Sequence, residues 1–465
     1  MLFDNKMAQV YYPIPDRSSL TTQYVGKPLE DVPVPAIILD VAKVKRNCKL
    51  MLDAVEELGV EFRAHVKTHK TLELTRLQLG DYSKDVRLIG STLAELEALL
   101  PLMKSYQQEG AKTNVLYGVP VGPSHIQRLA SFLQNAGPGS LSLMIDHPTQ
   151  LTTVQRIYDL TDSMQVQVYL KTDSGYHRAG LPPASNRMQQ LVKATLELEA
   201  RGILLLLGFY SHNSNSYSGN SPSDAMDHLR AEVDACTEAA LRNTPEGYVD
   251  SRKEPLAISC GASPTALSLQ NLLNNSTDTA KTPAAKALKS SLAEAGESNI
   301  HFEIHAGVYP TFDMQQVSAM SRDLGDRPED NIAISVLAEV CSTYPDRTEI
   351  PEALVSAGGI ALAREPCKSY RGHGVITGWL MPDGYNPYDM KNRIIVDRIS
   401  QEHGLLQWED RNVTKELPLE YGQRLQIWPN HACITGSQYG WYFVIDSDSD
   451  DANIVRDIWM RIRGW

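Results

Sequence analysis

The chain has 465 residues, of which 42% are hydrophobic and 22% are charged. These fractions match soluble globular proteins with large cores, so they exclude wholesale disorder. The 44 basic and 56 acidic side chains leave a net charge of −12, and no dense Lys/Arg cluster occurs, which argues against nucleic acid and anionic membranes as partners.

Strand-like and helix-like runs alternate along the first two thirds of the chain, which is the pattern of a parallel sheet with crossover helices. A β-branched run at 35–40 precedes a predicted helix at 41–58, where apolar residues recur at helical spacing up to Gly59. Eight further predicted strands follow, seven of them before a plausible helix. They lie at 61–67, 86–90, 114–119, 140–146, 165–173, 203–211, 256–261 and 301–307.

Eight parallel strands with intervening helices favour a (β/α)8 TIM barrel, although the same alternation could also build an open doubly wound sheet. Residues 274–299 are rich in Ala, Lys, Ser and Thr and are predicted to form a surface insertion, and 321–331 a linker. Short β runs without long helices then predict a mainly β domain. These runs lie at 332–343, 352–356, 374–378, 404–407, 424–428 and 440–445.

The predicted organisation is an extension at 1–34, a barrel domain at 35–330 and a β domain at 331–465. The amino terminus shows no basic segment followed by an apolar one, and no run of apolar residues is long enough to span a membrane. We therefore expect a cytoplasmic protein. Six cysteines without a close CxxC pair do not suggest a disulfide framework, and we expect most of them to be reduced core side chains.

Polar residues at the carboxyl ends of the predicted strands are candidates for an active site, because that face of a barrel carries the chemistry. The first strand ends in HVKTHK at 65–70. A lysine buried in a barrel mouth can form an imine with an aldehyde cofactor, since burial frees its amine. The same stretch, taken alone, could be a solvated basic loop.

Three later strand ends carry comparable groups. GYHRAG occupies 175–180, and YSH at 210–212 is followed by Tyr217. The segment SCGASP at 259–264 can turn backbone N–H groups toward a phosphate, and Gly307 with its neighbours follows the last strand beside it. Each segment alone could be an ordinary turn, but together they predict a phosphate-bearing cofactor site.

The β domain contains a His-x-Cys pair, His431 and Cys433. On an extended segment both side chains would lie on one face, and imidazole with thiolate suits Zn²⁺. Two protein ligands would leave two positions for water or substrate, as in catalytic zinc sites. A lone HxC pair is otherwise often accidental.

These motifs resemble those of the eukaryotic-type, zinc-dependent D-serine dehydratase family. Its members are fold-type III pyridoxal-phosphate enzymes, related to D-threonine aldolases and, more distantly, to alanine racemases. The resemblance spans roughly residues 34–465 and rests on the HVKTHK, GYHRAG, YSH…SY, SxGxSP and HxC segments. It implies an alanine-racemase-type barrel with a β domain, and that the strand at 35–40 joins the β domain.

The resemblance also implies roles for individual residues. Lys67 matches the Schiff-base lysine, Arg178 the residue that meets the pyridine nitrogen, and His431 with Cys433 the zinc ligands. The remaining implied cofactor-binding residues are Tyr210, Tyr217, Gly261, Ser263, Gly307, Val308 and Tyr309.

The function implied by the resemblance is β-elimination of D-serine to pyruvate and ammonia by a homodimer. Lys67 would remove the Cα proton, and zinc would activate the β-hydroxyl group. One alternative is a D-threonine or 3-hydroxy-D-aspartate aldolase or dehydratase of the same fold; in the aldolases, Asp usually stands where this chain has Cys433. Another is a non-enzymatic pyridoxal-phosphate carrier, a class that lacks a metal-bearing β domain.

Overall fold

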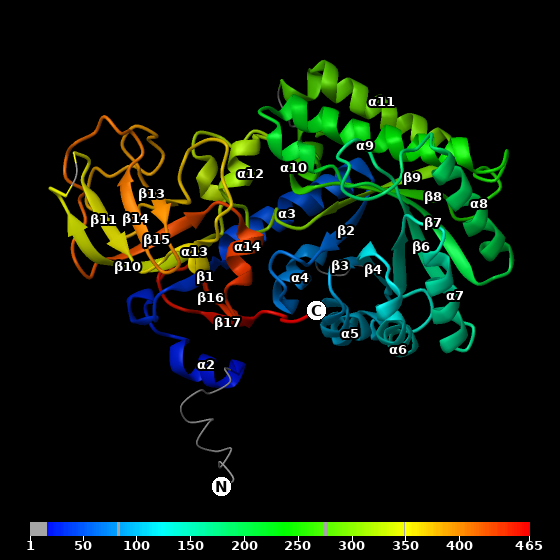
Figure 1. Ribbon diagram of the computed structural model, residues 1–465, viewed down its shortest axis with the longest axis horizontal. Helices are drawn as coiled ribbons and strands as arrows, with labels where there is room; N and C mark the ends of the chain where they lie inside the picture. Colours follow the sequence, from blue (N-terminus) through cyan, green and yellow to red (C-terminus); the bar gives the residue numbers. More distant parts are fainter. Residues whose placement is uncertain (1–15, 81–83, 274–277, 348) are drawn as a thin grey trace, which may run out of the picture.

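The amino-terminal two thirds of the chain form a closed barrel of eight parallel strands, as predicted. The computed structural model describes residues 16–80, 84–273, 278–347 and 349–465. Figure 1 shows the barrel beside a second, sheet-built unit. The barrel strands are β2 (Glu61–His65), β3 (Asp85–Gly90), β4 (Lys112–Pro120), β5 (Leu141–Ile145), β6 (Val166–Lys171), β7 (Leu204–Tyr210), β8 (Leu256–Cys260) and β9 (Ile300–Ala306).

Helices cover the outside of the barrel because each buries one apolar face against the strands. Helix α3 (Val41–Leu58) has the predicted bounds: the Asp40 side chain caps its first turn, and Gly59 ends it in the left-handed conformation. The others are α4 (Leu72–Leu79), α5 (Leu93–Gln108), α6 (Ile126–Ala136), α7 (Gln150–Leu160), α8 (Asn186–Ala200), α9 (Pro222–Asn243), α10 (Ser263–Ser268) and α11 (Pro283–Glu297).

The prediction of a surface insertion at 274–299 is wrong for most of that segment. Residues 274–277 lie outside the described residues, and Pro283–Glu297 forms helix α11, which packs against α9 and β9. Its buried face consists of Ala284, Ala285, Leu288 and Ala295. Because three of these four side chains are alanine, the helix lies close to the barrel, and it provides the crossover between the last two strands.

The second unit is a nine-stranded sheet in the order β11-β14-β13-β12-β15-β10-β1-β16-β17. Strand β1, from the start of the chain, pairs antiparallel with β10 and parallel with β16, so it lies inside this sheet and not in the barrel. The strands are β1 (Ala36–Asp40), β10 (Ile334–Tyr344), β11 (Glu352–Val355), β12 (Gly374–Ile376), β13 (Ile394–Ile399), β14 (Gly404–Trp408), β15 (Arg424–Pro429), β16 (Trp441–Ile445) and β17 (Asp457–Met460). Strands β13 and β17 were absent from the predicted set.

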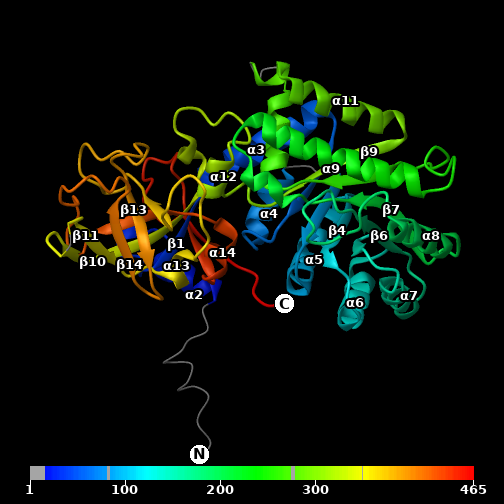
Figure 2. The same cartoon turned by 45° about the horizontal axis from the view of Figure 1, so that its top comes forward.

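Among the described residues, four short helices accompany the sheet, and one of them, α12 (Met314–Ala319), lies in the connection from β9 of the barrel to β10 of the sheet. Helix α14 lies on the side of the sheet that faces the barrel in both views (Figures 1 and 2). The short helices are α2 (Arg17–Tyr24), α12 (Met314–Ala319), α13 (Gly359–Leu362) and α14 (Ala432–Ser437), with 3₁₀ turns at Leu29–Asp31, Pro123–His125, Ser214–Ser218, Leu269–Leu272, Thr279–Lys281 and Pro328–Asn331.

The apolar core is continuous from the barrel into the sheet, because Ile37 and Leu39 of β1 belong to the same buried cluster as the barrel helices. Inside the barrel, Arg63 Nε donates to Glu303 Oε1 at 2.7 Å, so both buried charges are paired. This ion pair fills part of the barrel interior, and the carboxyl ends of the strands are where a barrel carries its chemistry.

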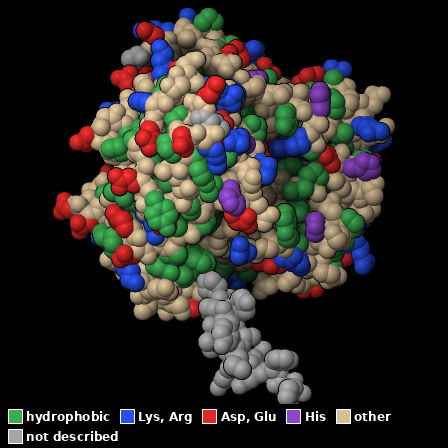
Figure 3. Space-filling view, turned by 60° about the vertical axis from the view of Figure 1, so that its left-hand side comes forward, with side chains coloured by type: hydrophobic (Ala, Val, Ile, Leu, Met, Phe, Trp, Pro, Cys, Tyr) green, Lys and Arg blue, Asp and Glu red, His purple; other side chains and the backbone are tan. Residues whose placement is uncertain are grey.

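The surface carries charges of both signs. On the face shown in Figure 3, basic and acidic side chains are interspersed. None of the helices in the described part of the chain is both long enough and apolar enough to cross a membrane. All six cysteines are free; four are buried as predicted, whereas Cys341 is exposed and Cys433 is partly exposed.

Candidate active site

A cavity of about 710 Å³ opens between the carboxyl ends of the barrel strands and the β unit. Both units contribute to its walls. Nine of the eleven residues expected from the sequence line it: Lys67, Arg178, Tyr217, Gly261, Ser263, Gly307, Val308, His431 and Cys433. Tyr210 and Tyr309 are not among its lining residues.

Lys67 follows β2 directly and opens onto the cavity. Burial lowers the pKa of its amine; the Cys433 thiolate opposes this shift, and the Arg178 guanidinium reinforces it. A lowered pKa increases the fraction of neutral amine, which is the form that reacts with an aldehyde. The environment of Lys67 therefore suits imine formation.

Two loops form a narrow cradle beside Lys67. Gly261 has φ of +145°, and a Cβ atom there would lie 2.3 Å from the carbonyl oxygen of His305. The Val308 amide donates to Ser263 Oγ at 3.0 Å, which joins the loop after β8 to the loop after β9. A cradle of backbone and small side chains at a helix start fits a phosphate group.

Replacing Gly261 by Ala tests this cradle. We expect a loss of about 3 kcal/mol in unfolding free energy and weaker binding of pyridoxal phosphate, because the added methyl group overlaps the β9 backbone. Urea unfolding and cofactor titration measure both effects. Gly296→Ala is the control, since no atom lies within 4 Å of that Cβ position; equal stability of the two variants would contradict the steric argument.

Three histidines at the cavity floor, His65, His212 and His305, did not feature among the predicted site residues. Burial lowers the pKa of all three, with a smaller contribution from the Lys67 ammonium, so they are neutral near pH 7. His212 Nδ1 donates to the Gly261 carbonyl at 2.6 Å. The floor thus offers uncharged ring nitrogens.

The His305 ring is supported from below. Tyr210 stacks on it with centroids 4.3 Å apart and an interplanar angle of 10°, which explains why Tyr210 does not line the cavity. His305 Nδ1 lies 3.1 Å from Ser259 Oγ, and no group in the described part of the chain hydrogen-bonds its buried Nε2. That nitrogen is free to meet a polar atom of a bound molecule.

Arg178 lies on the loop at 173–180, where the Asp173 carboxylate accepts hydrogen bonds from the Gly175 and His177 amides. Its side chain is exposed, and its guanidinium lies 5.8 Å from the Tyr176 ring centroid. Its expected contact with the pyridine nitrogen stays a prediction.

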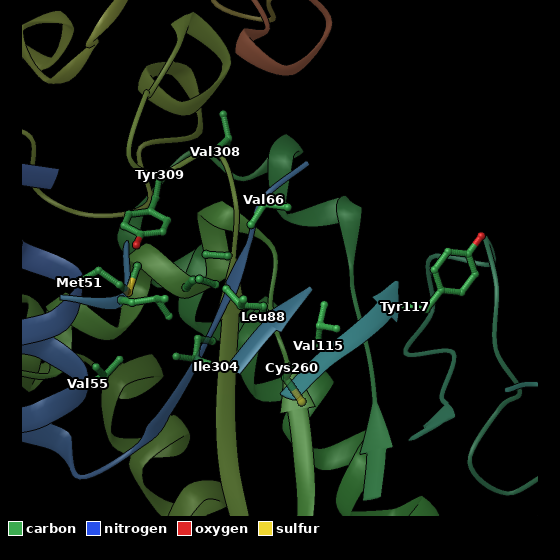
Figure 4. Close-up of a cluster of buried hydrophobic side chains, with 14 of the residues drawn as sticks. Met51, Val55, Val66, Leu88, Val115, Tyr117, Cys260, Ile304, Val308 and Tyr309 are labelled. Carbon is green, nitrogen blue, oxygen red and sulfur yellow. The ribbon is translucent and has the colours of Figure 1, made fainter. Parts of the chain in front are cut away.

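Tyr309 follows Val308, but its ring is fully buried and packs edge-on against Phe62 with centroids 5.9 Å apart. Figure 4 shows it among apolar side chains, on the side of Met51 and α3. The structure therefore brings only the backbone of Tyr309 near the cradle.

His431 and Cys433 meet at the start of α14. His431 is extended, whereas Cys433 lies in the first helical turn, so the expected fully extended segment is wrong; both side chains nevertheless line the cavity. Burial alone would raise the pKa of the Cys433 thiol, but His431, Lys67 and Thr68 together lower it. These three neighbours therefore stabilise the thiolate form of Cys433 relative to that of an isolated cysteine.

The donor set fits a metal ion with open positions. No hydrogen bond satisfies His431 Nδ1 within the described residues, and this atom lies 3.9 Å from Glu365 Oε2. Asp313 Oδ2 accepts from the Ala432 amide at 2.8 Å and so fixes the start of α14. Among described residues no three His, Cys, Asp or Glu side chains are arranged as metal ligands, so a metal at this pair would keep two protein ligands.

Comparisons with known proteins agree with this architecture. The alanine racemase N-terminal domain matches residues 39–278, and the serine dehydratase domain matches 333–445. D-Serine dehydratase of Schizosaccharomyces pombe is 36% identical over 464 residues, which cover 99% of each chain. That of Saccharomyces cerevisiae is 31% identical, covering 96% of this chain and all of the relative.

The solved structure of an alanine racemase-like protein from Idiomarina loihiensis superposes with a TM-score of 0.70 at 26% identity, covering 94% of this chain and all of that one. Barrel, sheet and cavity thus define a lyase built on the alanine racemase fold, and this fold implies pyridoxal phosphate as cofactor. The chain belongs to the D-serine dehydratase family.

Proposed function

We propose that this protein eliminates water from D-serine, giving pyruvate and ammonia, with pyridoxal phosphate and Zn²⁺ as cofactors. The observation that carries the proposal is that one cavity contains both a lysine suited to imine formation and a His-Cys pair suited to metal binding. Thr68, the neighbour of Lys67, places Oγ1 3.1 Å from Cys433 Sγ, so the imine-forming lysine and the metal-binding pair face one another. The family relationship supports the choice of D-serine.

On the lysine side, pyridoxal phosphate bound at Lys67 would supply an electron sink for the pair left on Cα. Once the amino group of D-serine had taken its place on the cofactor, the freed Lys67 amine would accept the Cα proton, and its lowered pKa favours the neutral form that this step needs. The neutral histidines of the floor add no positive charge around the amine. Gly261, Ser263 and Val308 would hold the phosphate group.

On the opposite wall, His431 and Cys433 would hold Zn²⁺, which would supply Lewis-acid assistance to a departing β-hydroxyl group. A thiolate is a soft ligand that suits Zn²⁺ better than Mn²⁺. Cys433 therefore favours elimination over the aldolase alternative, in which a harder ligand is usual. A non-enzymatic carrier of pyridoxal phosphate would not need a pair of metal ligands in its cavity.

Product analysis tests the proposal. Purified protein loaded with pyridoxal phosphate and Zn²⁺ is incubated with D-serine, D-threonine or 3-hydroxy-D-aspartate. We expect pyruvate and ammonia in equal amounts from D-serine. Glycine plus an aldehyde from D-threonine, with D-serine unchanged, would identify an aldolase, and absence of turnover with all three would favour the carrier.

A further inference from the structure

Three segments that are far apart in sequence meet behind the cavity: the loop at 66–70, helix α14 and the carboxyl-terminal segment after β17. Arg461 stands at their junction and is 7% exposed. Its Nε donates to the His69 carbonyl at 3.1 Å and its Nη2 to the Thr68 carbonyl at 3.1 Å. Its Nη1 donates to the Gly436 carbonyl of α14.

Arg461 donates hydrogen bonds both to the loop at 66–70 and to helix α14. Two of its acceptors belong to the loop that carries Lys67, and the third belongs to the helix that carries Cys433. A guanidinium has several donors in one rigid plane, so it fixes its acceptors relative to one another more tightly than an ammonium could.

Neighbouring contacts hold the guanidinium itself in place. The Arg461 amide donates to the Gly440 carbonyl at 2.9 Å, and the Ile462 amide donates to the Lys70 carbonyl at 2.7 Å. The Tyr442 ring lies on one side, with its centroid 5.6 Å from the guanidinium carbon. Arg461 is therefore a rigid link and not a mobile surface side chain.

We propose that Arg461 is a positioning residue, which fixes the side-chain nitrogen of Lys67 relative to the sulfur of Cys433 by holding the backbones of both elements. This inference rests on the proposed function, because the two groups act on adjacent atoms: the Cα proton leaves toward one wall and the β-hydroxyl toward the other. The loop belongs to the barrel and α14 to the β unit, so a small shift between the units changes their separation. A displacement of about 1 Å can cost about 100-fold in rate.

The rate at which a disulfide forms between the loop at 66–70 and helix α14 reports on this separation. The measurement needs no cofactor, metal or turnover. Thr68→Cys would place a thiol near the Oγ1 position, 3.1 Å from Cys433 Sγ, and a disulfide needs the sulfurs at about 2.05 Å. Diamide is the oxidant: it takes two electrons and two protons from the thiols as the S–S bond forms. The metal-free protein is treated, and thiol loss and peptide mapping give the rate.

We expect Thr68→Cys to form the bond with Cys433 and the added Arg461→Met change to slow it at least tenfold. Arg463→Met is the matched control: it removes the same charge from an exposed residue two positions further on, and the rate should stay within twofold. Equal rates with and without Arg461 would overturn the proposal. This result does not depend on D-serine turnover, so it is separable from a failure of the proposed function.

The holoenzyme gives the second readout. In Arg461→Met we expect kcat for D-serine to fall about 100-fold, with KM within threefold and with cofactor absorbance and zinc content retained. Loss of cofactor or zinc in parallel with activity, or an unchanged kcat, would overturn the positioning role. Should Arg461→Met not fold, Arg461→Lys replaces it, for which we expect the charge to preserve folding but less than a tenth of the wild-type kcat to remain.

Discussion

Replacing Lys67 by Ala is expected to abolish both the visible absorbance of the cofactor imine and the turnover of D-serine. Lys67 opens onto the cavity directly after β2, and its pKa is lowered by burial. Loss of both its covalent role and its proton-accepting role should reduce kcat by more than about 1,000-fold. Absorbance spectra and a coupled pyruvate assay measure the two effects.

The matched control is Lys171, the other buried lysine nearby. Burial lowers its pKa to about 8, but its Nζ lies 4.7 Å from the Tyr210 ring centroid, and it does not line the cavity. Lys171→Met should therefore keep the imine absorbance. If this variant lost the absorbance while Lys67→Ala kept it, the assignment of the imine to Lys67 would be wrong.

The second large effect concerns the metal pair. Cys433→Ala should remove bound Zn²⁺ and lower kcat for D-serine about 1,000-fold, since Lewis-acid assistance is worth several kcal/mol. The cofactor absorbance should persist, because Lys67 and the cradle belong to the barrel. Elemental analysis, spectra and pyruvate formation measure these outcomes.

Cys367→Ala provides the control, because Cys367 is the other thiol that lines the cavity and its Sγ donates to the Met314 carbonyl at 3.4 Å. We expect that variant to retain zinc. Full D-serine turnover by wild-type enzyme after a chelator has removed the metal would exclude zinc from the reaction.

Local signals in the sequence predicted most of the fold. Helix α3 has the predicted bounds because its apolar spacing and Gly59 are both local features. Helix α11 was missed because its buried face is mostly alanine, so its composition is that of a surface segment. Strand β17 has only four residues, among them Asp457, and gains stability from pairing with β16, which is not visible in its own sequence.

The sequence predicted some residues of the site and missed others, again because only local signals can be recognised in it. Lys67 lies in a turn, and Ser263 and Cys433 lie at the starts of short helices, where motifs are compact; the structure brings all three to one cavity. His305 lies inside a predicted strand and was overlooked. Alternation of His301, Glu303 and His305 in β9 could have revealed it, because residues two apart share one face of a strand. The partnership of Arg461 with the loop at 66–70 needs the tertiary structure.

The place of β1 inside the nine-stranded sheet, between β10 and β16, has a consequence for synthesis of the protein. Ile38 pairs with Ser335 of β10 and with Phe443 of β16, so both partners of β1 are translated long after it. Translation adds about 5–20 residues per second, so β1 has no pairing partners for tens of seconds after its own synthesis. The barrel can form during that time, whereas the nine-stranded sheet is complete only after β16 and β17 emerge. The two proposed metal ligands, His431 and Cys433, therefore reach their place at the cavity only late in synthesis.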